Sequence, residues 1–165
     1  MTKYAVSFLL MLLLAVPTFA QNKPAKSKSG AHPDKALMQE IWDGWSTRDP
    51  GNVAKFYAKG PHVFFDIAPL KYSSWAEYEE GVKKVLAGFS TLKCTVNDDA
   101  MLHPHGNLVW GTATVHEVDT KTDGSKGEGD FRWTVVWEKQ GGQWLIVHEH
   151  VSVPAAGGPP PEKKH

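Results

Sequence analysis

The chain has 165 residues, with 18 basic and 18 acidic side chains, so its formal net charge is zero. A balanced charge without a basic stripe is not typical of nucleic-acid-binding proteins, and we expect no nucleic-acid partner. Cys94 is the one cysteine, which excludes an intramolecular disulfide. An apolar core therefore has to hold the fold together.

The first twenty residues are typical of a secretory signal peptide. Lys3 gives a positive start, residues 6–16 are apolar, and Thr18-Phe19-Ala20 presents small residues at the positions that signal peptidase reads. The apolar run is too short to span a bilayer as a helix. We expect cleavage after Ala20, export to the periplasm or the medium, and no membrane attachment afterwards.

The segments that flank the rest of the chain are polar and rich in Gly and Pro. Residues 21–32 are predicted to form a disordered leader, and residues 155–165, AAGGPPPEKKH, a disordered tail. One folded domain is therefore predicted over residues 33–154, which is long enough for a single core.

Three helices are predicted in the first half of this domain. Residues 33–48 carry apolar side chains at helical spacing. Asp49-Pro50 is typical of the start of a second, short helix. The Ser74-x-x-Glu77 sequence is a capping box, which predicts a third helix that ends near residue 87.

The second half changes to the two-residue period of strands. A strand at residues 62–66 precedes the third helix, and Gly141-Gly142 indicates a tight hairpin. Residues 103–106 are interpreted as a turn. Helices on one face of a curled antiparallel sheet make an α+β domain. The long strands are predicted at residues 89–97, 107–118, 129–139 and 143–153.

Three segments of the chain carry a resemblance to a known family. They are residues 65–72 (FDIAPLKY), residues 132–134 (RWT) and the ending at residues 142–154 (GQWLIVHEHVSVP). With this order of elements, the chain resembles the SnoaL-like, ketosteroid-isomerase-type branch of the nuclear transport factor 2-like superfamily, which has a cystatin-like fold. The resemblance implies a cone-shaped curved sheet around three helices, a cavity at the open end, and a homodimer.

The ending is also similar to that of the association domain of calcium/calmodulin-dependent kinase II, whose cavity carries arginines on three strands. Those positions fall on Val115, Val135 and Val151 of this chain, so the arginine set is missing. The resemblance implies that Glu117 and Glu149 face the cavity. The opposite alternation would instead turn the other face of the last strand inward, and the sequence leaves both open.

The last predicted strand contains His148, Glu149 and His150 between apolar residues. Because side chains alternate along a strand, the two histidines share one face and Glu149 takes the other. If Glu149 is buried it needs a partner, and Arg132 on the neighbouring strand is the candidate. The opposite alternation would place Arg132, Thr134 and both histidines inside together.

Four residues are candidates for catalysis. Asp66 follows an apolar strand, and burial at a cavity mouth would raise its pKa towards the range of a general base, although it could equally accept turn amides. Glu149 is the second candidate base, and His150 with Arg132 could orient or polarise an oxygen. The histidines could equally be hydrogen-bonded within the sheet or at a dimer interface.

Aromatic side chains are the candidates for ligand contacts. Trp42, Tyr57, Tyr72, Trp133 and His148 are predicted to line the cavity, although the tryptophans could instead fill the core. The sequence has no His-Glu-x-x-His, Cys-x-x-Cys or phosphate-loop motif, so we predict neither a metal site nor a cofactor.

Two functions remain open. The first is an exported protein that binds a small, largely apolar molecule in the cone. The second is a cofactor-independent isomerase, dehydratase or hydrolase that uses a carboxylate as general base.

Overall fold

The structure is a computed structural model that describes residues 32–67 and 69–155. The predicted signal peptide (1–20), nearly all of the leader (21–31) and the tail from residue 156 lie outside the described residues, so these assignments stay predictions. Within the described ranges, no helix has the length and hydropathy needed to cross a membrane.

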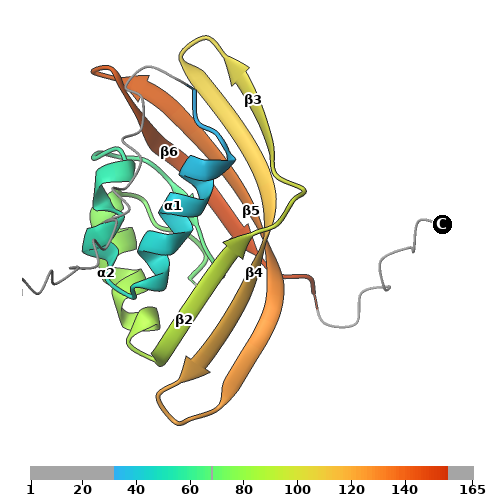
Figure 1. Cartoon of the computed structure of the whole chain (residues 1–165). Coiled ribbons are helices and arrows are strands. Elements are labelled where there is room, and N and C mark those ends of the chain that lie inside the picture. The colour runs from blue at the N-terminus through green and yellow to red at the C-terminus, as the bar shows by residue number, and fades with distance from the viewer. Residues whose placement is uncertain (1–31, 68, 156–165) are drawn as a thin grey trace, which may run out of the picture.

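The domain consists of a curved six-stranded sheet with helices on one face, which confirms the predicted α+β class (Figure 1). Two of the helices are α-helices, and the predicted second helix is a pair of 3-10 turns instead. In chain order the elements are α1 (Lys35–Ser46), η1 (Pro50–Asn52), η2 (Ala54–Phe56), β1 (Phe64–Phe65), α2 (Trp75–Leu86), β2 (Phe89–Val96), β3 (Met101–His105), β4 (Leu108–Lys121), β5 (Lys126–Gln140) and β6 (Gln143–Ser152).

The helix caps follow the sequence signals closely. The Ser74 hydroxyl accepts a hydrogen bond from the Glu77 amide at 3.2 Å, and the Glu77 carboxylate accepts one from the Ser73 amide at 2.8 Å. At η1, the Asp49 carboxylate accepts from the Gly51 amide at 2.9 Å, as an N-cap does. That element ends after three residues, because Gly51 and the following asparagine are weak helix formers.

The sheet has the order β1-β6-β5-β4-β2, and β3 pairs with β4 beside β2. All pairs are antiparallel except β1 with β6. The strand predicted at residues 62–66 shortens to Phe64–Phe65. The predicted four long strands are found to within a few residues at their ends.

The turn predicted at residues 103–106 is wrong, because His103, Pro104 and His105 belong to strand β3. This strand pairs only with β4, so Pro104 lies at an edge of the sheet. Proline is tolerated there because no strand on the other side needs its missing N–H as a hydrogen-bond donor. The reversal is confined to Gly106-Asn107, and Gly106 has a positive φ of 61°.

The core lies between the two α-helices and the inner face of the sheet. The buried stripe of α1 packs against large side chains of β5, such as Phe131 and Trp133. The stripe of α2 begins with Trp75 and Tyr78 and closes the other side of the core. The buried residues of α1 are Met38, Ile41, Trp42 and Trp45.

A β-bulge in β6 decides which side chains face this core. Val136 pairs with His148 but Trp137 pairs with Ile146, which leaves Val147 as the extra residue. Ile146 and Glu149 are therefore both buried although they are three positions apart. The simple alternation predicted for this strand fails at the bulge.

Candidate functional site

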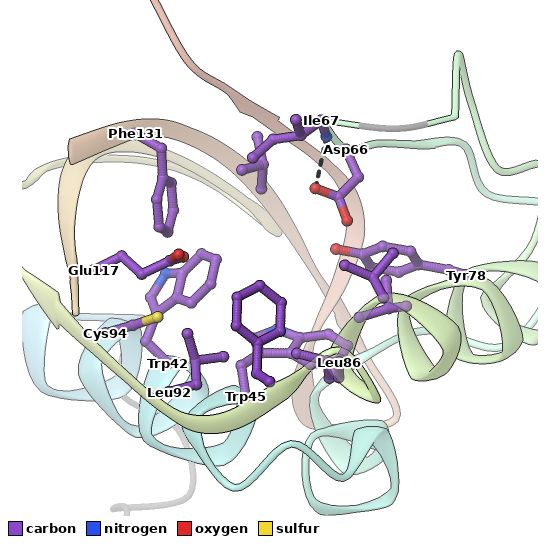
Figure 2. Close-up of a pocket in the computed structure, with 14 residues that line it drawn as sticks. Trp42, Trp45, Asp66, Ile67, Tyr78, Leu86, Leu92, Cys94, Glu117 and Phe131 are labelled. Atoms are coloured by element: carbon purple, nitrogen blue, oxygen red, sulfur yellow. Dashed lines mark hydrogen bonds between the residues drawn. The ribbon is translucent and has the colours of Figure 1, made fainter. Parts of the chain in front are cut away.

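A pocket of about 140 Å³ opens between the helices and the inner face of the sheet (Figure 2). An apolar cavity of about 150 Å³ is large enough for benzene, so this pocket suits a molecule with one ring or a short chain. The lining residues are Trp42, Trp45, Asp66, Ile67, Tyr78, Val82, Val85, Leu86, Phe89, Leu92, Cys94, Glu117, Phe131 and Val151.

Polar groups stand at two ends of this mostly apolar pocket. Asp66 follows β1 and Tyr78 comes from α2, and Figure 2 shows the carboxylate and the hydroxyl pointing towards one another. Glu117 comes from β4 on the other side, beside Trp42. The buried Trp42 Nε1 has no hydrogen-bond partner among the described residues, so it can donate to an oxygen of a ligand.

Asp66 is the pocket residue best suited to accept a proton. Burial raises the pKa of its carboxyl, and the hydrogen bond from the Ile67 amide to Asp66 Oδ1, 2.7 Å long, opposes that rise only in part. A carboxyl with a raised pKa holds a removed proton more firmly, as a general base requires. The same amide contact is also the turn interaction that the sequence allowed for.

Glu149 lies under the pocket and is held by neutral donors. It is 1% exposed, its oxygens each accept from the Tyr57 hydroxyl at 3.0 Å, and Oε2 accepts from Trp133 Nε1 at 2.9 Å. Tyr78 also hydrogen-bonds to this carboxyl, and Trp45 Nε1 donates to the Tyr57 hydroxyl at 3.1 Å. Burial outweighs these bonds and raises the pKa of Glu149 to about 7.

The predicted partner of Glu149 is not in place. Arg132 is exposed and lies on the outer face of β5, where it pairs with Ser152. Glu149 instead faces inward beside Val135, because the alternation implied by the association domain is the one that the sheet adopts. The alternative, with Arg132 and both histidines inside, is wrong for this structure.

The two histidines of β6 are on the outer face of the sheet. His148 Nδ1 lies 2.7 Å from the Val63 carbonyl oxygen, and the ring of Phe65 stands at 5.5 Å from that of His148 and 5.6 Å from that of His150. His150 is exposed. Neither histidine lines the pocket, so they and Arg132 cannot contact a molecule bound in it.

Of the aromatic residues predicted to contact a ligand, Trp42 lines the pocket. Tyr57 and Trp133 are core residues that bind Glu149. Tyr72 packs against Tyr78, with ring centroids 5.1 Å apart. Tyr78 escaped the sequence analysis, although the buried stripe of the third predicted helix was a signal that could have identified it.

The end of the pocket at β4 carries a pair of carboxyls and a thiol. Glu117 and Asp119 both point to the inner face of β4, and burial, followed by the neighbouring Asp119 carboxyl, raises the pKa of Glu117. Cys94 pairs with Glu117 across the strands. Burial raises the pKa of this thiol to about 12, so it stays protonated and is a poor nucleophile.

Within residues 32–67 and 69–155, no three His, Cys, Asp or Glu side chains gather as a metal site requires.

Residues 35–156 match the family model described as SnoaL-like domain. The chain belongs to this family. The match covers every helix and strand of the described domain and confirms the resemblance drawn from the sequence. No curated protein matches the chain.

Solved structures share the fold at low sequence identity. A nuclear transport factor 2-like superfamily protein from Salmonella enterica serovar Typhimurium is 21% identical, with a TM-score of 0.66 over 78% of this chain and 96% of that chain. The association domain of C. elegans CaMKII is 15% identical, with a TM-score of 0.58 over 72% and 91%. A candidate scytalone dehydratase from Novosphingobium aromaticivorans is 10% identical, with a TM-score of 0.63 over 71% and 78%.

The raised pKa of Glu149 makes stability depend on pH. The folded state holds this proton up to about pH 7, whereas an unfolded glutamate releases it near pH 4.5. Unfolding therefore releases a proton between these values, and the free energy of unfolding falls as pH rises through this window, by about 2–4 kcal/mol. Glu149→Gln cannot ionise at this position, so its free energy of unfolding should lack this fall with rising pH.

Urea denaturation at several pH values measures the difference between the Glu149→Gln and native profiles. This difference isolates Glu149 from Asp66 and Glu117, whose pKa values are raised in the same direction. Glu40→Gln, at an exposed position on α1, is the control and should leave the native profile unchanged over this pH range. Parallel profiles for the native protein and Glu149→Gln would contradict the assignment.

Proposed function

We propose that this protein binds a small, largely apolar molecule in the pocket between its helices and its sheet. The observation that carries the proposal is a space of about 140 Å³ within a core otherwise packed with aromatic rings. Ligand sites are typically apolar hollows with a few polar groups that set orientation. Asp66, Tyr78 and Glu117 are such groups here.

Filling the pocket should abolish binding. Leu92 lines it from strand β2, and Leu92→Trp would place an indole ring in the space. Single-ring compounds such as toluene, phenol and cyclohexanone should raise the melting temperature of the native protein but not that of the variant. A ligand at a hundred times its Kd stabilises a protein by about 2.7 kcal/mol, which a thermal-shift assay detects.

Leu70→Trp is the matched control, because Leu70 is 91% exposed and does not line the pocket. It should respond to the compounds as the native protein does. If no compound shifts the native melting temperature, the binding proposal fails.

A second candidate function is supported by the position of Asp66. Its carboxyl faces the pocket with a raised pKa, and Trp42 Nε1, which has no hydrogen-bond partner among the described residues, could donate to an oxygen of a substrate. Together they form the minimum for removal of a proton next to a carbonyl group, which is a step in isomerisation and dehydration. Among proteins of this fold, one relative is described as a candidate scytalone dehydratase.

Exchange of hydrogen for deuterium next to the carbonyl of cyclohexanone tests this chemistry by NMR. The native protein should accelerate the exchange, and Asp66→Asn should slow it by about 10²–10⁴-fold, the usual contribution of a general base. Asp98→Asn, at an exposed carboxyl that pairs with Lys35, is the control. Exchange at the uncatalysed rate in the native protein would leave binding as the function.

We propose further that two chains associate through the outer faces of β4, β5 and β6. The helices leave this face open (Figure 1). Its centre is the cross-strand row Thr112, Thr134 and His150, and Trp110 nearby is 46% exposed. A second copy related by a twofold axis would cover the same residues on both chains.

Light scattering after gel filtration should therefore give the mass of two chains for the native protein. Thr134→Glu would place two like charges near the twofold axis and should give the mass of one chain. Glu40→Gln, an exposed change on α1, should keep the native mass. A native mass of one chain would contradict the dimer.

A further inference from the structure

The charged groups of the pocket are all negative. Its lining includes Asp66 and Glu117 but no Lys, Arg or His. None of the ion pairs among residues 32–67 and 69–155 involves Asp66, Glu117 or Asp119. A molecule that enters this pocket therefore meets carboxyls whose charge the described part of the protein does not neutralise.

The end at Glu117 carries a second carboxyl, that of Asp119. Asp119 stands two residues further along the inner face of β4 and is 7% exposed, and its Oδ1 is buried with no hydrogen-bond partner among the described residues. Two adjacent carboxyls repel each other when both are charged, so this pair gains from a nearby positive charge. Burial, followed by the neighbouring Asp119, raises the pKa of Glu117. A cation beside Glu117 would favour its ionised form.

Aromatic rings flank the same carboxyl. Figure 2 shows the Glu117 side chain beside Phe131 and Trp42, whose rings contact each other with centroids 4.9 Å apart. The face of an aromatic ring attracts a cation, most strongly when the ring is tryptophan. A carboxylate with two rings beside it is a chemical environment that favours an ammonium group over a neutral or anionic one.

We propose that the ligand is a small apolar amine, bound as its ammonium ion with the charged end at Glu117 and the hydrocarbon body along the pocket. This inference rests on the proposed function and specifies the chemical class of its ligand. Asp66 adds to the negative potential from the other end, where the Ile67 amide already satisfies one of its oxygens. Glu117 is therefore the main ammonium contact. Asp119 adds a second carboxyl at the next inward-facing position of β4.

Three compounds of nearly equal size test the charge preference on the full protein. Benzylamine is a cation at neutral pH, benzyl alcohol is neutral and benzoate is an anion. Titration calorimetry or ligand-observed NMR should give a Kd for benzylamine at least tenfold below that for benzyl alcohol, with benzoate the weakest. Raising the salt concentration should weaken benzylamine more than benzyl alcohol.

Variants then locate the ammonium group. Glu117→Gln keeps the shape of the side chain. It should lower the affinity for benzylamine about tenfold and leave the affinity for benzyl alcohol unchanged. Asp66→Asn should reduce benzylamine affinity by less than threefold. Glu40→Gln, the same substitution at an exposed position on α1, should have no effect. A larger loss in Asp66→Asn than in Glu117→Gln would overturn the placement at Glu117.

The outcomes also separate this inference from the proposed function. If benzyl alcohol binds as tightly as benzylamine, or benzoate binds best, the amine inference is wrong and the binding function stands. If none of the three compounds binds, and the neutral ring compounds also leave the melting temperature unchanged, both are wrong. The native comparison needs no variant, so it decides the charge preference even if Glu117→Gln does not fold.

Discussion

The burial of the Glu149 carboxyl is the interaction on which the rest of this structure depends. A carboxyl that is almost fully buried is costly unless hydrogen bonds replace those it loses to water. Its donors come from separate elements: Tyr57 after η2, Tyr78 on α2 and Trp133 on β5. Satisfying this one group on β6 therefore fixes how the helical layer sits on the sheet. The pocket is the space that this arrangement leaves beside Tyr78.

The buried carboxyls in this pocket and next to it differ in the hydrogen-bond donors that the protein supplies to them. Glu149 has hydrogen-bond donors from three side chains, Asp66 has one backbone amide, and Glu117 has chiefly another carboxyl. The least satisfied group is thus in the pocket lining, where a bound molecule can supply what the protein lacks. A buried carboxyl that lacks hydrogen-bond donors lowers the stability of the fold. Proteins retain such groups most readily where a bound ligand uses them. This contrast links the stability of the core to the function of the pocket.

Local signals in the sequence predicted much of the fold. The capping box at Ser74, the Asp49-Pro50 start and the period of the long strands act over a few residues, so they do not depend on the rest of the chain. The error at Pro104 has the opposite origin. Proline normally argues against a strand, and only the pairing of β3 along one side of β4 shows that this position is an edge.

The sequence alone determined the family, the order of the two α-helices and the four long strands, and the position of Asp66 directly after a short strand. Only the tertiary structure decided which face of β6 looks inward, because both faces are half apolar and the helices cover one of them. The bulge at Val147 then brings Ile146 and Glu149 to the same side, which no alternating pattern could predict. Arg132 and the two histidines consequently lie outside. Tyr78, from a distant helix, takes the place beside Glu149 that the sequence had suggested for arginine.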